Sequence, residues 1–290
     1  MPPAVFVLAL LSAVASAAST IFIRQGLRHS TPYAGFWINL VVGIVTLWTG
    51  VLLTEGFGHL SLKGAALFAL AGLIGTTGGR LLRFVSIEQV GASIASALIN
   101  LNPLVSTGLA ILLLGERVTL PILAGTIVIV LGTTSLSIGG FRLGVRPGQL
   151  VLPILSAVCF GVVAILRKSG LAHTGPVLGS AINASTAFIA FTTFLLASGH
   201  GSEMRCRDRR SLAHFIAAGV AENAGVFLTV VALGLGTVSV VTPLTATGPI
   251  FVLLLSFAFL RGIERLTARI VLGTILIVLG VYLITALAGR

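Results

Sequence analysis

Apolar residues fill the chain in long stretches that are separated by short polar connections. A hydrocarbon core about 30 Å thick is crossed by roughly 20 helical residues, so stretches of this length predict membrane-spanning helices. We find ten of them, at residues 4–23, 33–53, 64–85, 92–114, 119–138, 149–166, 176–198, 212–233, 237–260 and 267–287. The pattern predicts an all-α membrane protein with ten transmembrane helices.

Composition supports this interpretation and excludes several classes of protein. Of the 290 residues, 56% are hydrophobic and only 9% are charged. The longest connection, residues 199–214, leaves no room for a soluble catalytic domain. We therefore expect a multi-pass integral membrane protein, placed in the bacterial cytoplasmic membrane, whose activity takes place within the bilayer.

Charge and cysteine content narrow the function further. The net charge of +11 is spread over many short helix-end connections rather than a basic domain, which argues against nucleic acid as a partner. The two cysteines, Cys159 and Cys206, are too few for a metal site or a disulfide framework. Without a nucleotide-binding or catalytic motif, we expect neither an enzyme nor a cofactor.

The chain contains two copies of one unit. An offset of 144 residues aligns Leu11–Val14 with Leu155–Val158, and small drifts carry the alignment to the end of the chain. The two units are residues 1–145 and 146–290, with five helices each. Because five is odd, the second unit must enter the membrane from the opposite side. The sequence thus predicts two inverted repeats around a central cavity, as in many transporters; a duplicated scaffold or channel is the alternative.

Three features of each unit resemble a known family. They are a proline in the fourth helix, a tight Gly-Glu-Arg turn in "LLLGERVT" (112–119), and a fifth helix written "LAGTIVIVLG" (123–132), echoed by "VLGTILIVLG" (271–280). Together they resemble the EamA-type members of the drug/metabolite transporter superfamily, and within it the amino-acid exporters of the YddG type. The resemblance implies a transporter of a small molecule, and we expect it to act as a monomer in the lipid bilayer. It departs at Asn39 and Asn183, where family members often carry a basic residue.

Polar residues interrupt the fourth apolar stretch along one side. On a helix at 100° per residue, Ser93, Ser96, Asn100, Pro103 and Thr107 share one face, and the ninth stretch repeats this face with Ser239, Thr242 and Pro249. Irregular backbone within a membrane is tolerated against protein or a water-filled cavity. We therefore expect helices 4 and 9 to line the cavity, with hinges at Pro103 and Pro249. Small hydroxyls that merely bond neighbouring helices are the alternative, and Asn102 is assigned to the opposite side as a contact between helices.

Intramembrane charges are costly and point to function. Arg80 lies in the third stretch with Thr76 on the same face, and Glu222 lies in the eighth beside Asn223. We expect Arg80 to face the carboxylate of a zwitterion and Glu222 or Asn223 to face its ammonium group. A purely structural pair between Arg80 and Glu222 is the alternative, whereas Arg83, close to its helix end, is expected to extend into the interface.

The remaining repeated motifs are assigned to packing. Gly125 with Gly132, and Gly273 with Gly280, are seven residues apart, so each pair lets the fifth helix of its unit approach a neighbour closely. The turn at Glu116 is expected to cap and fix its own hairpin, with a gating role as the alternative.

Two indications of orientation disagree. With a cytoplasmic N-terminus, the cytoplasmic connections hold only Lys63, Arg117, Arg167 and Lys168, whereas the opposite side holds four arginines between residues 205 and 210 alone. The positive-inside rule then favours both termini outside. The family resemblance implies both termini inside, and we give the charge count the greater weight.

These features favour a secondary-active transporter that exports amino acids or related small metabolites by alternating access. Two alternatives stay open. One is a proton-coupled exporter of cationic or lipophilic compounds that uses Glu222 as its exchanging carboxylate. The other, from a different class, is a passive channel or a membrane scaffold subunit.

Overall fold

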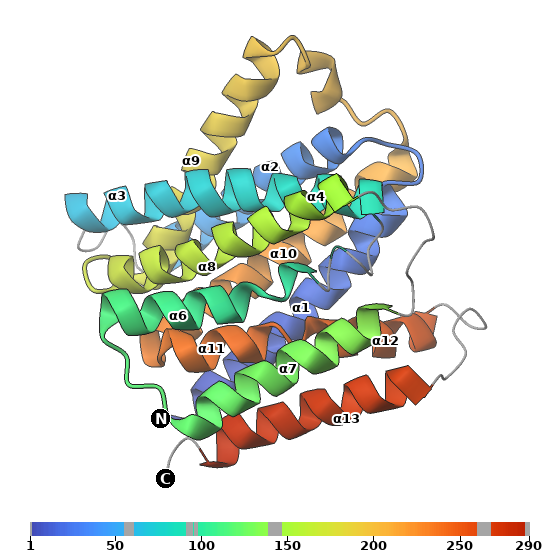
Figure 1. The fold of residues 1–290 in the computed structure, drawn as a ribbon. Helices are drawn as coiled ribbons and strands as arrows, with labels where there is room; N and C mark the ends of the chain where they lie inside the picture. Colours follow the sequence, from blue (N-terminus) through green and yellow to red (C-terminus); the bar gives the residue numbers. More distant parts are fainter. Residues whose placement is uncertain are drawn as a thin grey trace.

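The structure is a computed structural model that describes residues 2–54, 61–90, 95, 98–138, 147–259 and 268–287. Within these ranges the chain is helical and has no strand, as the hydropathy pattern predicted. Figure 1 shows the helices packed side by side as a bundle, with segments from both halves of the sequence interleaved.

The two copies of the repeat contribute matching sets of elements. The first holds α1 (Pro3–Gly26), α2 (Pro32–Leu53), α3 (Leu62–Ala71), the π-helical segment η1 (Gly72–Gly79), α4 (Arg80–Val90), α6 (Asn102–Leu114) and α7 (Leu120–Ile138). The second holds the 3-10 turn η2 (Pro147–Leu150), α8 (Val151–Leu171), α9 (Pro176–Ala197), the 3-10 turn η3 (Gly201–Met204), α10 (Arg209–Leu235), α11 (Val238–Thr245), α12 (Gly248–Phe259), α13 (Ala268–Tyr282) and the π-helical segment η4 (Leu283–Leu287).

Six helical segments of the described chain are long and apolar enough to cross a membrane. They are Pro3–Gly26, Pro32–Leu53, Leu62–Val90, Gly148–Leu171, Pro176–Ala197 and Arg209–Leu235. Shorter apolar helices occupy Asn102–Leu114, Leu120–Ser135, Val238–Val252 and Leu272–Thr285, within the other predicted stretches. Several helices continue past the predicted ends. Arg167 and Lys168, which we expected in a connection when counting charges, lie in α8 instead.

The fourth and ninth segments are both interrupted just before their prolines. Pro103 and Pro249 each occupy the second residue of a new helix, α6 and α12, where a missing backbone N–H costs no helical hydrogen bond. The same backbone bonds span the two interruptions at an offset of 146 residues. They are Leu101 N to Leu98 O (3.2 Å) with Leu104 N to Leu101 O (3.0 Å), and Thr247 N to Leu244 O (3.3 Å) with Ile250 N to Thr247 O (3.0 Å).

The π-helical segment η1 accounts for one drift in the repeat. Gly72 corresponds to Gly219 at an offset of 147, but Gly79 corresponds to Gly225 at an offset of 146. The third helix of the first copy therefore holds one more residue between these points than α10 does. A π-helical turn accommodates such an insertion without breaking the helix, and these turns occur frequently at functional sites.

The copies pack on each other through equivalent residues. Phe68 of α3 and Phe215 of α10 are both fully buried. Each lies against two glycines of the other copy, where any side chain would collide with the ring: Phe68 against Gly170 and Gly179, and Phe215 against Gly26 and Gly35. The repeated glycines thus leave the space in which a phenylalanine of the opposite copy packs.

The fifth helices of the copies, α7 and α13, lie side by side and antiparallel (Figure 1). A methyl group added at Gly125 would lie 2.8 Å from Gly280 O, and one at Gly132 would lie 2.8 Å from Gly273 O. The expected packing role of these glycines is therefore observed.

Large apolar side chains cover much of the outer surface of the bundle. Leu62, Leu112 and Leu120 are 87%, 79% and 79% exposed. Such a surface suits contact with lipid, whose chains offer no hydrogen-bond partners.

Candidate functional site

A cavity of about 190 Å³ lies between the two copies. Its wall is formed by one face of each of α1, α8 and α10, together with Arg83 of α4, the end of α11, and the interruptions before α6 and α12. The residues that carry its polarity are Ser12, Ser16, Thr20, Arg83, Asn100, Asn102, Arg167, Glu222, Thr229, Thr242 and Thr245.

Helical periodicity explains how the sequence builds this wall. On α1, Ser12, Ser16 and Thr20 follow one another at four-residue intervals, which places them on one face. On α8, Phe160, Ala164 and Arg167 share a face in the same way. Small side chains dominate on α1, and these leave open the space that the cavity occupies.

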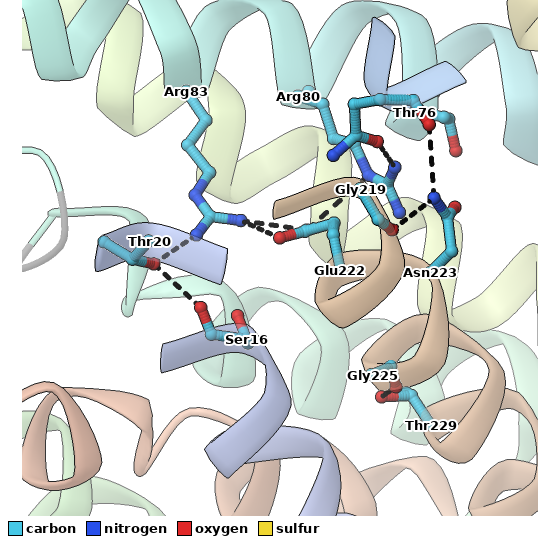
Figure 2. Close-up of polar contacts among 12 residues, drawn as sticks. Ser16, Thr20, Thr76, Arg80, Arg83, Gly219, Glu222, Asn223, Gly225 and Thr229 are labelled. Atoms are coloured by element: carbon cyan, nitrogen blue, oxygen red, sulfur yellow. Dashed lines mark hydrogen bonds and ion pairs between the residues drawn. The ribbon is translucent and has the colours of Figure 1, made fainter. Parts of the chain in front are cut away.

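An ion pair borders the cavity. Arg83 Nη1 donates to both carboxylate oxygens of Glu222, at 3.0 and 3.2 Å, and Arg83 Nη2 donates to Thr20 Oγ1 at 2.6 Å. Figure 2 shows Arg83 reaching between Thr20 of α1 and Glu222 of α10. The two charged side chains are 13% and 8% exposed, so the pair lies at the cavity surface and not in bulk water.

Arg80 lies behind this pair. It is 4% exposed, and its Nε stands 3.7 Å from Glu222 Oε1. Its Nη1 donates to Asn39 Oδ1 at 3.0 Å, and the Asn39 backbone oxygen accepts from Asn223 Nδ2 at 3.2 Å. Arg80 therefore supports the position of Glu222 from outside the cavity, and Asn223 holds Asn39, the partner of Arg80.

A third arginine faces the cavity from α8. Arg167 Nη2 donates to Asn183 Oδ1 at 3.3 Å, and Asn183 Nδ2 donates to Thr76 Oγ1 at 2.7 Å. Within the described ranges no carboxylate forms an ion pair with Arg167. Thus Asn39 and Asn183, which are equivalent in the repeat, each accept a hydrogen bond from one arginine.

The charges break the symmetry that packing residues keep. Ser12 and Ser156 are equivalent, and each donates at 2.8 Å to an equivalent carbonyl, Gly225 O and Gly79 O. The charged residues have no charged counterpart: Arg80 corresponds to Val226, Arg83 to Thr229, Arg167 to Ile23, and Glu222 to Thr76. Building the unit therefore does not require these charges, which marks them as functional candidates.

The residues singled out from sequence fall into three groups. Glu222, Asn100 and Thr242 line the cavity. Arg80, Thr76 and Asn223 lie behind it in the hydrogen-bond network. Ser96, like Ser93, lies outside the described residues.

Three expectations about individual side chains were wrong. Arg83 does not extend into the interface, because the carboxylate of Glu222 holds it inward. Asn102 lines the cavity instead of its opposite side, since the interruption at residues 100–101 ends the helical phase that related it to Asn100. Arg167 was expected in a connection. Its counterpart in the repeat, Ile23, lies within the first apolar stretch, and this alignment could have shown that Arg167 lies within a helix.

The turn at Glu116 also acts differently from expectation. Gly115 ends α6 in the left-handed conformation (φ 64°), which forms the tight turn. Glu116, however, accepts hydrogen bonds from Val238 N (2.8 Å), Ser239 N (3.0 Å) and Ser239 Oγ (2.6 Å). Glu116 therefore caps the start of α11, in the other copy, although it lies in the turn that ends α6.

Comparison with known proteins matches both copies. The sequence model of the EamA-like transporter family matches residues 4–138 and again residues 147–286. A solved structure described as "Crystal structure of protein" superposes with a TM-score of 0.79 at 17% identity, covering 100% of this chain and 99% of that one. At this identity the likeness concerns the fold alone. The search of curated proteins gave no match.

Proposed function

Because the chain belongs to the EamA-like transporter family, of the drug/metabolite transporter superfamily, we propose that it exports amino acids or related small metabolites as a secondary-active transporter. The family and the apolar helices make it a multi-pass membrane protein of a transporter class. Export, the amino-acid substrate, a monomeric state and a place in the bacterial cytoplasmic membrane are the proposed part.

The observation that carries the proposal is the cavity between the copies. Its volume of about 190 Å³ lies below the roughly 300–1,000 Å³ of drug-sized sites, so it suits a small metabolite. Its wall offers both a carboxylate, Glu222, and a guanidinium, Arg83. A zwitterion needs one partner of each sign.

We assign the recognition roles accordingly. Glu222 receives the ammonium group, and Arg83, which faces the cavity, takes the carboxylate role first assigned to Arg80. Asn100, Thr242 and, from the predicted stripe, Ser96 complete the polar wall. Arg80 positions Glu222, Asn223 holds Asn39, which binds Arg80, and Thr76 holds Asn183, which binds Arg167. When a zwitterion parts Arg83 from Glu222, each charge exchanges one ionic partner for another, so no charge is left unpaired in a low-dielectric site.

Alternating access between inverted repeats of five helices, divided near residue 145, is the proposed mechanism. It is supported by the antiparallel crossing of the equivalent helices α7 and α13. It is also supported by α2 and α9, whose contacts Trp37 to Thr192 and Trp48 to Ser185 run in opposite directions along the two helices. A two-fold axis in the membrane plane brings equivalent helices together in this antiparallel way.

The test is uptake of labelled amino acids into inverted membrane vesicles, with and without a pH gradient. A secondary exporter should concentrate substrate in vesicles that contain the chain and not in vesicles that lack it. Equilibration without concentration under every gradient would instead support a passive channel. Loss of all pH response in Glu222→Gln alone would support the proton-coupled alternative, which the existing ion pair of Glu222 with Arg83 disfavours.

A further inference from the structure

The charge around the cavity does not balance. Arg80, Arg83 and Arg167 lie within the network that surrounds it, and Glu222 is the sole carboxylate with an ion pair there among the described residues. Arg83 and Arg80 share that carboxylate. Counted over the described residues, the site carries two more positive charges than negative ones, and Arg167 is the cation without an ion pair there.

Among the described residues, two hydrogen-bond donors at the cavity have no acceptor. Arg167 Nε and Asn100 Nδ2 are both inaccessible to solvent and bond to no other described group, and both residues line the cavity. Buried polar atoms in native proteins are almost always paired. Because guanidinium and amide N–H groups only donate, the partner that would satisfy either group is an acceptor.

The interrupted helices add donors of the same kind. Asn102 and Gly248, the first residues of α6 and α12, both line the cavity. Each start contributes a partial positive charge, which favours an anion, and at most the N–H of its first residue, since the second residue is proline and the N–H of the third is bonded to Leu101 O or Thr247 O. The repeat thus directs two helix starts toward a space that already holds an excess cation.

We propose that the transported substrate carries a net negative charge, with an acidic group seated against Arg167 and Asn100. This inference rests on the proposed function and adds the charge class of its substrate. In an amino acid, the Glu222 and Arg83 pair accounts for the ammonium and α-carboxylate groups, so Arg167 is left for a second acid group. Acidic amino acids and similarly small acidic metabolites fit this pattern, and neutral ones leave Arg167 without a partner.

Isosteric probes test the charge class directly. We would titrate the purified full-length protein with L-glutamate and L-glutamine, and with L-aspartate and L-asparagine, and read apparent affinities from thermal stabilisation. Each acid should bind at least about tenfold more tightly than its amide. Arg167→Gln should weaken binding of the acids by about 10- to 100-fold, the worth of one charge-assisted hydrogen bond, and change binding of the amides little.

Two further variants separate recognition from folding. Arg167→Lys keeps the charge, so it should keep the preference for acids even if Arg167→Gln does not fold. Arg24→Gln removes a charge from the exposed end of α1, outside the cavity wall, and should leave the preference unchanged.

The outcomes distinguish this inference from the proposed function. Amides that bind as well as acids, or a preference that survives in Arg167→Gln, would overturn the anionic substrate while leaving an amino-acid transporter standing. Binding of none of the four probes, together with no uptake of labelled amino acids into vesicles, would reject the amino-acid proposal and this inference with it.

Discussion

Glu222 is the residue on which the site depends, because it holds Arg83 at 3.0 Å and Arg80 at 3.7 Å. Removing one member of a buried ion pair leaves the other charge uncompensated, and this costs more than the intact pair contributes. The pair nevertheless borders a cavity, so water can moderate the cost. Structural and recognition roles therefore predict different behaviour when both charges are removed.

We expect Glu222→Gln and Arg83→Gln each to lower stability by about 1–3 kcal/mol, less than the roughly 3–5 kcal/mol of a dry pair. The double variant should regain only part of that loss, because it removes two opposite charges together but leaves Arg80 without its carboxylate; a double-mutant cycle on thermal unfolding measures the recovery. Transport should stay lost in the double variant, because both substrate partners are gone. Transport that returns together with stability would mean that the pair is structural only.

At the scale of the element, opposite charges hold the junction between α10 and α11. Lys168 Nζ donates to Leu233 O and Gly236 O at the end of α10, each at 2.7 Å. Glu116 accepts from the first N–H groups of α11. Each charge complements the dipole of the helix end that it meets, and together they fix the angle at which α11 leaves α10.

We expect Glu116→Ala to destabilise the start of α11 by about 1–3 kcal/mol, since it leaves two partly buried N–H groups without an acceptor. Hydrogen exchange of residues 238–241 should accelerate. Arg117→Ala, at the exposed neighbouring position, is the matched control and should leave that exchange unchanged. Equal hydrogen-exchange rates in the two variants would contradict the proposed capping of α11 by Glu116.

The interruptions before α6 and α12 supply the second prediction at this scale. If the two segments bend there during transport, Pro103→Ala should slow turnover more than it lowers expression or substrate binding, because alanine lets the helix continue through the break. Pro121→Ala, in the first turn of the uninterrupted α7, is the control. Unchanged turnover in Pro103→Ala would mean that the interruption before α6 does not bend during transport and only lines the cavity.

At the scale of the whole molecule, small residues decide how the copies meet. In lipid, close packing replaces the hydrophobic effect between helices, so backbone contact at glycine matters most. Gly132 touches the backbone of α13, which cannot move aside as a flexible side chain could. Gly108 of α6, in contrast, has open space around it.

We expect Gly132→Ala to destabilise the protein by about 1–3 kcal/mol through overpacking. Gly108→Ala should be neutral or stabilising by up to about 1 kcal/mol, since alanine favours the helix. Thermal unfolding in detergent measures both. Equal effects of the two substitutions would contradict the antiparallel contact of α7 and α13 on which the packing of the copies rests.

Local physics made the helices predictable from sequence. A segment in lipid must satisfy its backbone hydrogen bonds internally, so about 20 apolar residues suffice to indicate a helix wherever they occur. The repeat was equally visible, because packing residues such as Ser12 and Ser156, within the aligned runs Leu11–Val14 and Leu155–Val158, preserve it. Glu222 could be identified as a candidate because a charge inside an apolar stretch is costly wherever its partner lies.

Tertiary structure decided the partners and directions of the polar side chains. Asn102 turned toward the cavity because a two-residue interruption reset the helical phase. Arg83 turned inward and Arg167 joined the site because Glu222 and Asn183 reach them from other helices, contacts that span 139 and 16 residues of sequence. Hydropathy reports the environment of a segment, whereas the direction of one side chain depends on where each helix ends and which groups meet it there.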